Sequence, residues 1–279
     1  MSAWLPTAPC TPRDCAGHEG AGRMPPVAAA LLLAGCALTL LGVLCVPVVR
    51  LLAPARRDRL TRVWAYAVVR AFGVRIRVTG RPVEPGDPPS GELVVANHVS
   101  WLDIPLIAVV RPARMVAKSE IRGWPLIGRM AALGGTLFIE RDRLRALPGA
   151  VRALSDALAA GSSVAVFPQG STWCGRSSGG RFRPAAFQAA IDAGAPVRPV
   201  RIGYRTTETD AAGAAAFVGD DPLAASLWRV VSAAGLTAEI RVLPPIPAGS
   251  EPDRRALARA AQCAVASDSA NRPAVSVHH

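Results

Sequence analysis

The chain has 279 residues, of which 51% are hydrophobic and 19% charged, and it carries a formal net charge of +12. This apolar content excludes a disordered chain, and the length suits one sizeable domain with appended segments. The basic balance favours an anionic partner: nucleic acid, an acidic membrane surface or a phosphorylated small molecule. Aromatic residues make up only 5%, and no helix-turn-helix, zinc-finger or RNA-binding signature is present, so we expect no nucleic-acid partner.

The N-terminal part divides by composition into a tail and an apolar run. Residues 1–24 are rich in Pro, Gly and small polar residues, which predicts a flexible tail. Residues 25–49 contain no charge, and their length is enough to cross a hydrocarbon core of about 30 Å as a helix. We therefore predict a transmembrane helix. A signal peptide, whose apolar core is usually ~7–15 residues, and a buried core helix are the alternatives.

Arginines flank the apolar run unequally. Two precede it, Arg13 and Arg23, and five follow it closely, Arg50, Arg56, Arg57, Arg59 and Arg62. The positive-inside rule then predicts a single pass through the cell membrane with the bulk of the protein facing the cytoplasm.

Residues 50–73 combine these basic positions with apolar ones at every fourth residue: Leu60, Trp64, Val68 and Phe72. The pattern predicts a basic amphipathic helix at the membrane interface, with its arginines toward lipid phosphates. An ordinary amphipathic core helix fits the pattern equally well.

From residue 74 to residue 279 the pattern is that of one α/β domain. Short β-rich runs are predicted as strands at 74–78, 93–96, 114–118, 136–140, 164–168, 197–204 and 238–243. Between two of them, leucines and a valine recur at helical spacing from near Pro148 to a terminating Gly161. Residues 206–225 are expected to form a loop, and 252–268 a late helix. Strands interleaved with helices favour a layered α/β domain.

Cysteines are few and scattered. They occupy positions 10, 15, 36, 45, 174 and 263, without a CxxC pair or a histidine at ligand spacing. We therefore expect neither a disulfide framework nor a zinc site, and no metal in the functional site.

His98 is the only imidazole between the N-terminal tail and the last two residues. It follows Asn97 at the end of an apolar strand, and Asp103 comes five residues later. In a turn-to-helix geometry the carboxylate bonds one ring nitrogen, fixes the tautomer and leaves the other nitrogen to accept a proton. Alternatively, Ser100 to Asp103 is only a capping box at the start of a helix, and His98 is a turn residue.

Three further stretches place polar groups at strand ends. GTLFIER (135–141) ends a strand at Arg141, whose guanidinium suits bidentate phosphate binding. FPQGSTWCGR (167–176) ends another strand in a turn with hydroxyls and backbone amides, a composition that cups a polar or anionic group. VRPV (197–200) puts Pro199 in an apolar strand, which indicates an edge strand or a bulge beside a site.

In this order, the stretches resemble the four motifs of the lysophospholipid acyltransferases of the 1-acylglycerol-3-phosphate acyltransferase family, over about residues 74–204. The first motif, N-H-x-x-x-x-D, is matched by Asn97, His98 and Asp103. The second is matched by Gly135, Phe138, Ile139 and Arg141. The third, usually F-P-E-G-[TS], is matched by Phe167, Pro168, Gln169, Gly170 and Ser171, so that glutamine stands where the family has glutamate. The fourth is matched by Pro199 and Val200.

The resemblance implies a glycerolipid acyltransferase-like α/β fold: a layered mixed sheet flanked by helices, preceded by the N-terminal transmembrane helix. It also implies transfer of an acyl group from acyl-CoA or acyl-carrier protein to the hydroxyl of a lysophospholipid, most simply 1-acylglycerol-3-phosphate to phosphatidic acid, with no cofactor. His98 is then the general base and Asp103 orients it. Arg141 takes the acceptor phosphate, and the Gly170 loop helps to hold the head group. The other residues expected to bind substrate are Asn97, Gly135, Phe138, Pro168, Gln169 and Ser171.

Two alternatives stay open at this point. Gln169 would permit another acceptor, such as a lyso-ornithine lipid, and a catalytically silent lipid-binding protein would use His98 and Asp103 only to hold a turn. Arg176, Arg181 and Arg183 either bind phosphates of donor or acceptor or form part of a solvated basic face. Cys174 has no second histidine to activate it, so we predict a structural role for it.

Overall fold

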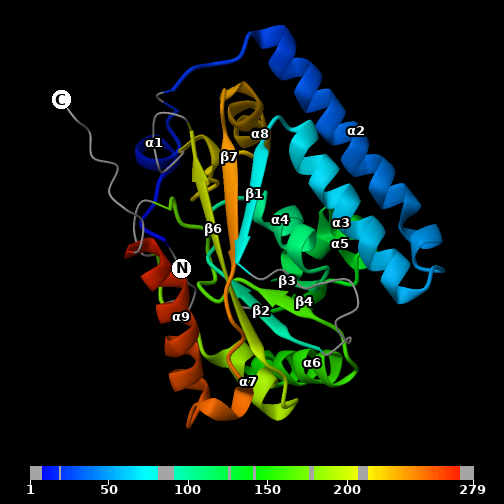
Figure 1. The fold of residues 1–279 in the computed structure, drawn as a ribbon, viewed down its shortest axis with the longest axis vertical. Coiled ribbons are helices and arrows are strands. Elements are labelled where there is room, and N and C mark those ends of the chain that lie inside the picture. Colours follow the sequence, from blue (N-terminus) through cyan, green and yellow to red (C-terminus); the bar gives the residue numbers. More distant parts are fainter. Residues whose placement is uncertain are drawn as a thin grey trace.

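In a computed structural model, the described residues are 8–18, 20–80, 91–124, 127–140, 143–175, 179–206 and 213–270. They form one seven-stranded sheet with the strand order β1-β7-β6-β2-β5-β3-β4 (Figure 1). All neighbours are parallel except β6 and β7. The strands are β1 Arg75–Gly80, β2 Leu93–Ala96, β3 Arg114–Lys118, β4 Leu137–Ile139, β5 Val164–Val166, β6 Val197–Arg205 and β7 Thr237–Val242. The predicted mixed sheet is thus confirmed.

Helices connect most of the strands and flank the sheet. They are α1 Pro12–Cys15, α2 Pro25–Val49, α3 Pro54–Ala71, α4 Asp103–Val110, α5 Ile127–Leu133, α6 Leu147–Ala159, α7 Ala185–Asp192, α8 Leu223–Ser232 and α9 Arg254–Ala270. Short 3-10 helices lie at Ser119–Gly123, Leu144–Ala146, Gly213–Ala215 and Ala248–Ser250. The expected loop at 206–225 is therefore partly wrong, because its described part contains a 3-10 turn and the start of α8.

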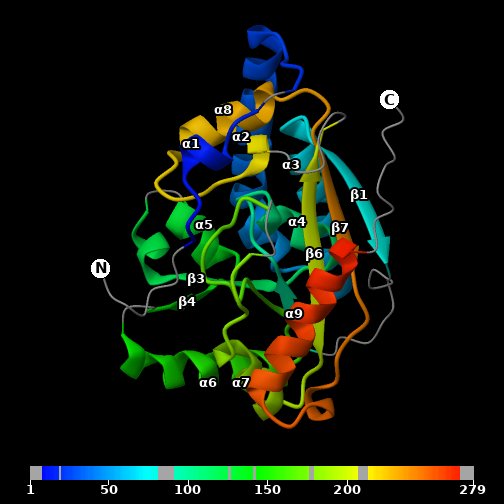
Figure 2. The same ribbon diagram turned by 90° about the vertical axis from the view of Figure 1, so that its left-hand side faces the viewer.

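The hydrophobic core lies on both faces of the sheet. Val94 and Ala96 of β2 pack with residues of α3, α4 and α8, whereas Leu93 and Val95 pack with residues of α6, α7 and α9. Alternate residues of a strand point to opposite faces, which explains why the four residues of β2 are all apolar and buried. Figure 2 shows α6, α7 and α9 together below and beside the strands. β2 is thereby a rigid support for whatever follows its carboxyl end.

Helix α6 has the sequence signals that were expected of it. Pro148 occupies its second position, where a missing N–H costs nothing. Beyond its end, Gly161 adopts φ +80°, and the N–H groups of Gly161 and Ser162 donate to the carbonyls of Leu158 and Ala157. The predicted start near Pro148 and the predicted glycine cap are both confirmed.

Pro199 lies in the interior of the sheet, since β6 sits between β7 and β2. The edge-strand alternative is therefore wrong. The bulge alternative agrees with the pairing: Val200 opposes Val242, but Val197 opposes Ile246, a shift of one residue. Proline is tolerated here because its missing N–H falls where the ladder with β7 changes register.

A buried ion network joins the amino ends of β2 and β6 to the end of α4. Glu92 is 2% exposed, and its two carboxylate oxygens lie 2.9 Å from Nε of Arg111 and 3.0 Å from Nε of Arg198. Each oxygen has a cationic partner, which is the condition under which a buried carboxylate is tolerated.

Helices α2 and α3 pack side by side as a hairpin on one side of the domain (Figure 1). Gly35 and Gly42 allow this approach, because a Cβ at either position would overlap the ring of Phe72 or Trp64. Trp64 also donates its indole N–H to the carbonyl of Leu38 at 3.0 Å. By its length of 25 residues and its hydropathy α2 could span a membrane, and only 6% of its most apolar window is buried.

Both ends of α2 contact the same domain. Just before its start, Arg23 donates to the carbonyls of Val231 at 2.8 Å and Gly73 at 2.7 Å. Just beyond its end, Arg50 donates to the carbonyl of Leu133. Both ends of α2 are thus bonded to the domain, and the predicted single pass through the membrane stays a prediction.

The N-terminal segment is also docked rather than free where it is described. Cys10 and Ala16 are buried, at 9% and 5% exposure, and α1 lies against the loops of the domain. The flexible tail over residues 1–24 is predicted from composition alone, and composition does not register these contacts.

Candidate active site

The first and third motifs meet at the carboxyl edge of the sheet. Asn97 and His98 follow β2, and Phe167 to Gly170 follow β5, the parallel neighbour of β2. Loops at the carboxyl ends of adjacent parallel strands share one edge, which is where open α/β sheets place their ligand sites. The motifs are 71 residues apart in sequence between His98 and Gln169, yet these two residues are directly hydrogen-bonded.

The predicted pair of His98 and Asp103 is present. Nδ1 of His98 lies 2.8 Å from Oδ2 of Asp103, whose side chain is fully buried, whereas the imidazole is 20% exposed. A carboxylate only accepts hydrogen bonds, so Nδ1 carries the proton and Nε2 has a lone pair. Nε2 has no hydrogen-bond partner among the described residues and is placed to accept a proton.

Backbone geometry holds the carboxylate in place. Oδ2 of Asp103 also accepts from the N–H groups of Val99 at 2.7 Å and Ser100 at 2.9 Å. This is the reciprocal half of the predicted capping box, although α4 itself begins at Asp103 rather than at Ser100. Asp103 thus caps the turn and bonds the imidazole with the same oxygen.

Tyr204 of β6 completes the site from the opposite side. Its hydroxyl donates to Oδ1 of Asp103 at 2.6 Å, and both side chains are buried. Burial, together with the neighbouring carboxylate, raises the pKa of Tyr204 well above its ordinary value, so the phenol keeps its proton and remains a donor. The sequence did not point to Tyr204, because it lies 101 residues from Asp103 and belongs to no recognised motif position.

Phe167 and the loop after it hold the histidine from the other side. The Phe167 ring stacks on the imidazole with 3.9 Å between centroids and 8° between planes. The backbone N–H of His98 donates to Oε1 of Gln169 at 2.8 Å, and the carbonyl of His98 accepts from the N–H of Trp173 at 2.8 Å. Ring and backbone are therefore both fixed by residues 167–173.

Gln169 is 4% exposed, with both ends of its amide directed at backbone. Besides the bond to His98, its Nε2 lies 3.5 Å from the carbonyl of Gly180, a long contact. Gly179 has φ +72°, and a Cβ there would overlap Nε2. Glycine at 179 thus makes room for the amide.

Asn97 is also bound to backbone. Its Nδ2 donates to the carbonyl of Ile202 at 2.7 Å, and its Oδ1 accepts from the N–H of Ile202 at 2.8 Å. The side chain extends the pairing of β2 with β6 beyond the last strand residue. This bond sets the point at which the chain leaves the sheet toward His98.

The rest of the third motif lines the same edge. Pro168 is buried, and Gly170 adopts φ +79° with its N–H bonded to the carbonyl of Phe167 at 3.0 Å. The Ser171 hydroxyl and the Trp173 indole N–H are buried and lack a hydrogen-bond partner within the described part of the chain. These two groups are candidates for contacts with a polar ligand.

The second motif lies on β4, the edge strand of the sheet, which is two strands away from β5 and the third motif. Gly135 precedes β4 with φ +77°, and its carbonyl accepts from Nε of Arg114 at 2.9 Å. Phe138 lies on β4 and carries the guanidinium of Arg122 over its ring at 5.8 Å. Arg141 and Arg176 lie outside the described residues. Arg181 and Arg183 are exposed.

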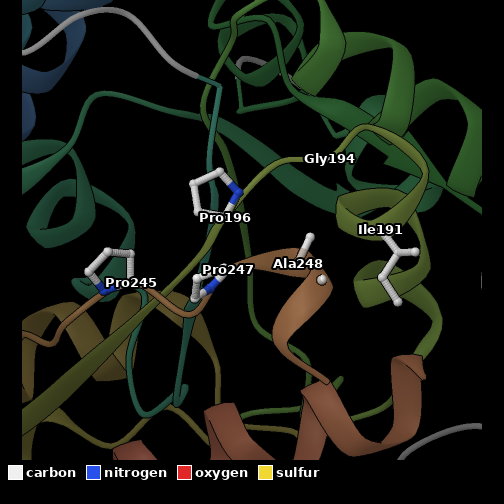
Figure 3. Close-up of a pocket in the computed structure, with 7 residues that line it drawn as sticks. Ile191, Gly194, Pro196, Pro245, Pro247 and Ala248 are labelled. Atoms are coloured by element: carbon white, nitrogen blue, oxygen red, sulfur yellow. The ribbon is translucent and has the colours of Figure 1, made fainter. Parts of the chain in front are cut away.

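A pocket of about 420 Å³ lies at the opposite edge of the sheet (Figure 3). One of its lining residues, Pro196, directly precedes β6. The carbonyl of Pro196 accepts a hydrogen bond from the N–H of Leu93, the first residue of β2, so the pocket lies at the amino ends of these two strands. The lining is made by Ile191, Gly194, Pro196, Pro245, Pro247, Ala248 and Gly249. None of these side chains titrates, so the pocket offers no acid–base chemistry.

Comparison with known proteins gives a consistent result. The model of the Acyltransferase family matches residues 75–203. The lyso-ornithine lipid O-acyltransferase of Pseudomonas aeruginosa is 38% identical over 213 residues, which cover 75% of this chain and 78% of that protein. The 1-acyl-sn-glycerol-3-phosphate acyltransferase of Neisseria meningitidis is 38% identical over 204 residues, 73% of this chain and 78% of that protein.

A solved structure has a similar fold. It is the 1-acyl-sn-glycerophosphate acyltransferase PlsC of Thermotoga maritima, which superposes with a TM-score of 0.64 over 89% of this chain and 97% of that chain, at 19% identity. This similarity supports the assignment of the fold.

Proposed function

The chain belongs to the acyltransferase family that includes the 1-acylglycerol-3-phosphate and lyso-ornithine lipid acyltransferases, and from this premise we propose that it transfers a fatty acyl group from a thioester to the hydroxyl of a lysolipid. The simplest acceptor is 1-acylglycerol-3-phosphate, which gives phosphatidic acid. The donor is acyl-CoA or acyl-carrier protein. The observation that carries the proposal is the buried carboxylate of Asp103 on Nδ1 of a histidine whose Nε2 has no partner among the described residues.

The chemistry needs a base and a positioned carbonyl. As the acceptor oxygen attacks the thioester carbon, its proton moves to Nε2 of His98, and Asp103 stabilises the imidazolium that forms. Collapse of the tetrahedral intermediate re-forms the carbonyl and breaks the C–S bond. A simple thiol has a pKa of about 8.5, so the thiolate leaves readily and then takes the proton from His98 or from water. No covalent enzyme intermediate and no cofactor are required.

Positioning residues surround this pair. The Tyr204 hydroxyl donates to Oδ1 of Asp103, and the Phe167 ring supports the imidazole by stacking. Asn97 and Gln169 are bonded to backbone, which supports a role in holding the loops rather than in touching the acceptor.

Substrate contacts are assigned to the remaining motif residues. Arg141 takes the acceptor phosphate, since the family's second motif ends in this arginine and a guanidinium binds phosphate bidentately. Gly135 and Phe138 set the geometry of the segment that leads to Arg141. Gly170 and Ser171 hold the head group, an assignment supported by the buried Ser171 hydroxyl without a described partner.

A second acceptor is favoured by the comparisons themselves. A lyso-ornithine lipid acyltransferase and a 1-acylglycerol-3-phosphate acyltransferase are equally similar to this chain, at 38% identity. An ornithine lipid has no phosphate, so it would not need Arg141. The acceptor is therefore tested directly.

The experiment uses purified full-length protein, one acyl-CoA, and equal concentrations of 1-acylglycerol-3-phosphate and a lyso-ornithine lipid, with products identified by mass spectrometry. We expect phosphatidic acid as the main product, and a tenfold or greater loss of it in Arg141→Ala but not in Arg145→Ala. Acylation of the ornithine lipid alone would replace the first acceptor by the second. Absence of both products with acyl-CoA and with acyl-carrier protein would overturn the proposal.

Membrane association is part of the same proposal. The outer face of α2 exposes Leu33, Leu41, Leu44 and Val48 at 56–71%, and both ends of the helix return to the domain. We therefore place the α2–α3 hairpin in one leaflet with the N-terminal segment and the active site on the same side of the bilayer, and keep the cytoplasmic side as the expectation from the arginines. Cysteine labelling in sealed vesicles tests this placement, with a cysteine introduced at Ser2 and with Cys36 and Cys45 replaced by serine. The introduced cysteine and the exposed Cys263 should react from the same side, and reaction from opposite sides would support the single pass.

A further inference from the structure

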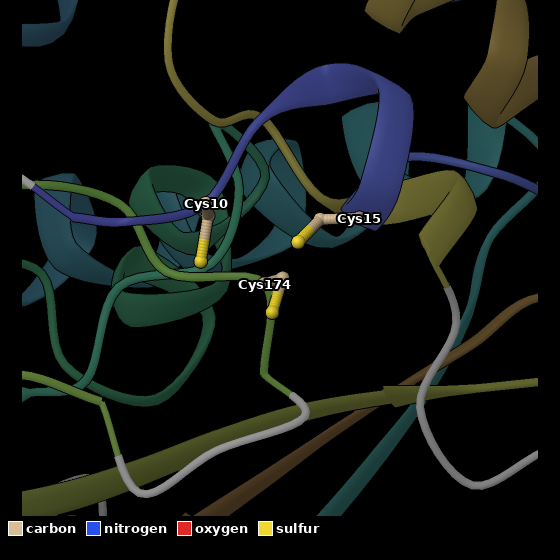
Figure 4. Close-up of side chains that lie close together, drawn as sticks. All are labelled: Cys10, Cys15 and Cys174. Atoms are coloured by element: carbon tan, nitrogen blue, oxygen red, sulfur yellow. The ribbon is translucent and has the colours of Figure 1, made fainter.

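Two cysteines of the N-terminal segment meet a third, far away in the sequence, in the loop that follows β5. Cys10 precedes α1, Cys15 ends it, and Cys174 lies in the loop that follows β5. Their sulfur atoms all lie within 4.8 Å of one another. Figure 4 shows the three side chains close together where the N-terminal segment meets the loop. Cysteines that are scattered along the sequence are thus brought together by the fold.

The surroundings of the cluster are apolar. Cys10 and Cys174 are 9% and 7% exposed, and they pack with Ala216 and Val218. Burial raises the pKa of Cys10, and burial together with the neighbouring thiols raises that of Cys15 to about 11. These thiols are therefore poor nucleophiles at neutral pH, which argues against a role in acyl transfer.

We propose that Cys10, Cys15 and Cys174 bind one thiophilic metal ion, Zn²⁺, as three thiolate ligands. Zn–S bonds of about 2.3 Å in a tetrahedral site put neighbouring sulfurs about 3.8 Å apart, so the cluster needs only a small contraction to reach this geometry. Three ligands leave the fourth tetrahedral position for water. Each thiol loses its proton to solvent as the metal binds.

Other uses of the three sulfurs fit less well. A disulfide joins two sulfurs and leaves the third unused. An iron–sulfur cluster takes four cysteines, and a fourth is not part of this group. A divalent ion leaves one net negative charge on three thiolates, whereas monovalent copper leaves two, and burial disfavours the larger charge.

Such an ion would join the N-terminal segment to the loop that supports His98. Trp173, the residue before Cys174, donates its N–H to the carbonyl of His98 at 2.8 Å. Metal at the cluster would therefore restrain the loop that bonds the backbone of His98. Its role is structural, and the site would exist whether or not the proposed acyl transfer is correct.

The test measures metal on the full-length protein in detergent. The protein is reduced with a phosphine, incubated with Zn²⁺ and desalted, and its metal content is determined by mass spectrometry. Incubation with Co²⁺ instead gives a thiolate-to-cobalt absorption band in the near ultraviolet. We expect one zinc per chain and the cobalt band in wild-type protein, and loss of both in Cys10→Ser, Cys15→Ser and Cys174→Ser. Cys263→Ser, which changes an exposed cysteine on α9, should retain both.

Stability gives a second readout that does not depend on folded variants. Zn²⁺ should raise the melting temperature of wild-type protein and of Cys263→Ser, because an ion that binds only the folded state stabilises it. Failure of reduced wild-type protein to retain zinc or to show the cobalt band would overturn the proposal. So would equal metal retention in the three cluster variants, or a disulfide between Cys174 and either partner in the purified protein.

Discussion

Replacing Asp103 with asparagine separates the charge of this residue from its hydrogen bonds. The N–H groups of Val99 and Ser100 both point at Oδ2 of Asp103. Because they require an acceptor, the introduced asparagine would place its carbonyl oxygen there, and the imidazole would keep its bond and its tautomer. The change therefore removes mainly the negative charge that stabilises the imidazolium of His98 during proton transfer.

The size of the effect follows from the geometry. Opposite charges about 4 Å apart interact by about 4 kcal/mol at an effective dielectric constant of about 20. Since about 1.4 kcal/mol corresponds to a factor of ten in rate, kcat should fall about 10³-fold, with KM nearly unchanged.

The assay measures initial rates of radiolabelled acyl transfer over a range of acceptor concentrations, with melting temperatures recorded in parallel. Asp156→Asn, the same change at an exposed position of α6, is the matched control and should behave as wild type. A folded Asp103→Asn protein with kcat within tenfold of wild type would refute the role assigned to the carboxylate.

Three further predictions concern positions whose contacts are buried. Tyr204→Phe removes the 2.6 Å bond to Asp103 and should lower the free energy of unfolding by about 1.5–3 kcal/mol. Because the pKa of this phenol is raised in the folded state, the difference from wild type should be full below pH about 10 and shrink above it, and equal denaturation curves at pH 8 would contradict the bond. Glu92→Gln leaves two arginines without their carboxylate and should cost about 3–5 kcal/mol by chemical denaturation, where a loss below about 1 kcal/mol would contradict the network. Gln169→Glu replaces the amide N–H that faces the Gly180 carbonyl with a carboxylate oxygen, so two acceptors then face each other. The variant should lower the melting temperature more at pH 8 than at pH 5, and the reverse order would contradict the placement of the amide.

The parts of the site that were predictable are those set by local spacing. Asn97, His98 and Asp103 lie within seven residues, so the end of one strand and one turn determine their geometry. Tyr204 reaches Asp103 only because β6 pairs with β2, and no local pattern specifies which strands become neighbours.

The same distinction applies to the N-terminal region. The apolar run of α2 was visible in the composition, but its packing against α3 depends on glycines whose partners come from later residues. Likewise Cys174 is about 160 residues from Cys10 and Cys15, and only the docking of the N-terminal segment on the β5 loop brings them together. Cysteine spacing in the sequence indicates ligand pairs that are close together along the chain. It does not indicate groups of cysteines that only tertiary contacts bring together.

The most direct test of acyl transfer by His98 is a comparison of wild-type protein with His98→Ala, each reconstituted in lipid and given radiolabelled acyl thioester and lysolipid. We predict that label enters the acylated lipid with wild-type protein and falls by at least 10³-fold with the folded variant, since no other imidazole lies in the described sheet domain. Transfer by His98→Ala at a rate near that of wild type would contradict the claim that this histidine takes the acceptor proton.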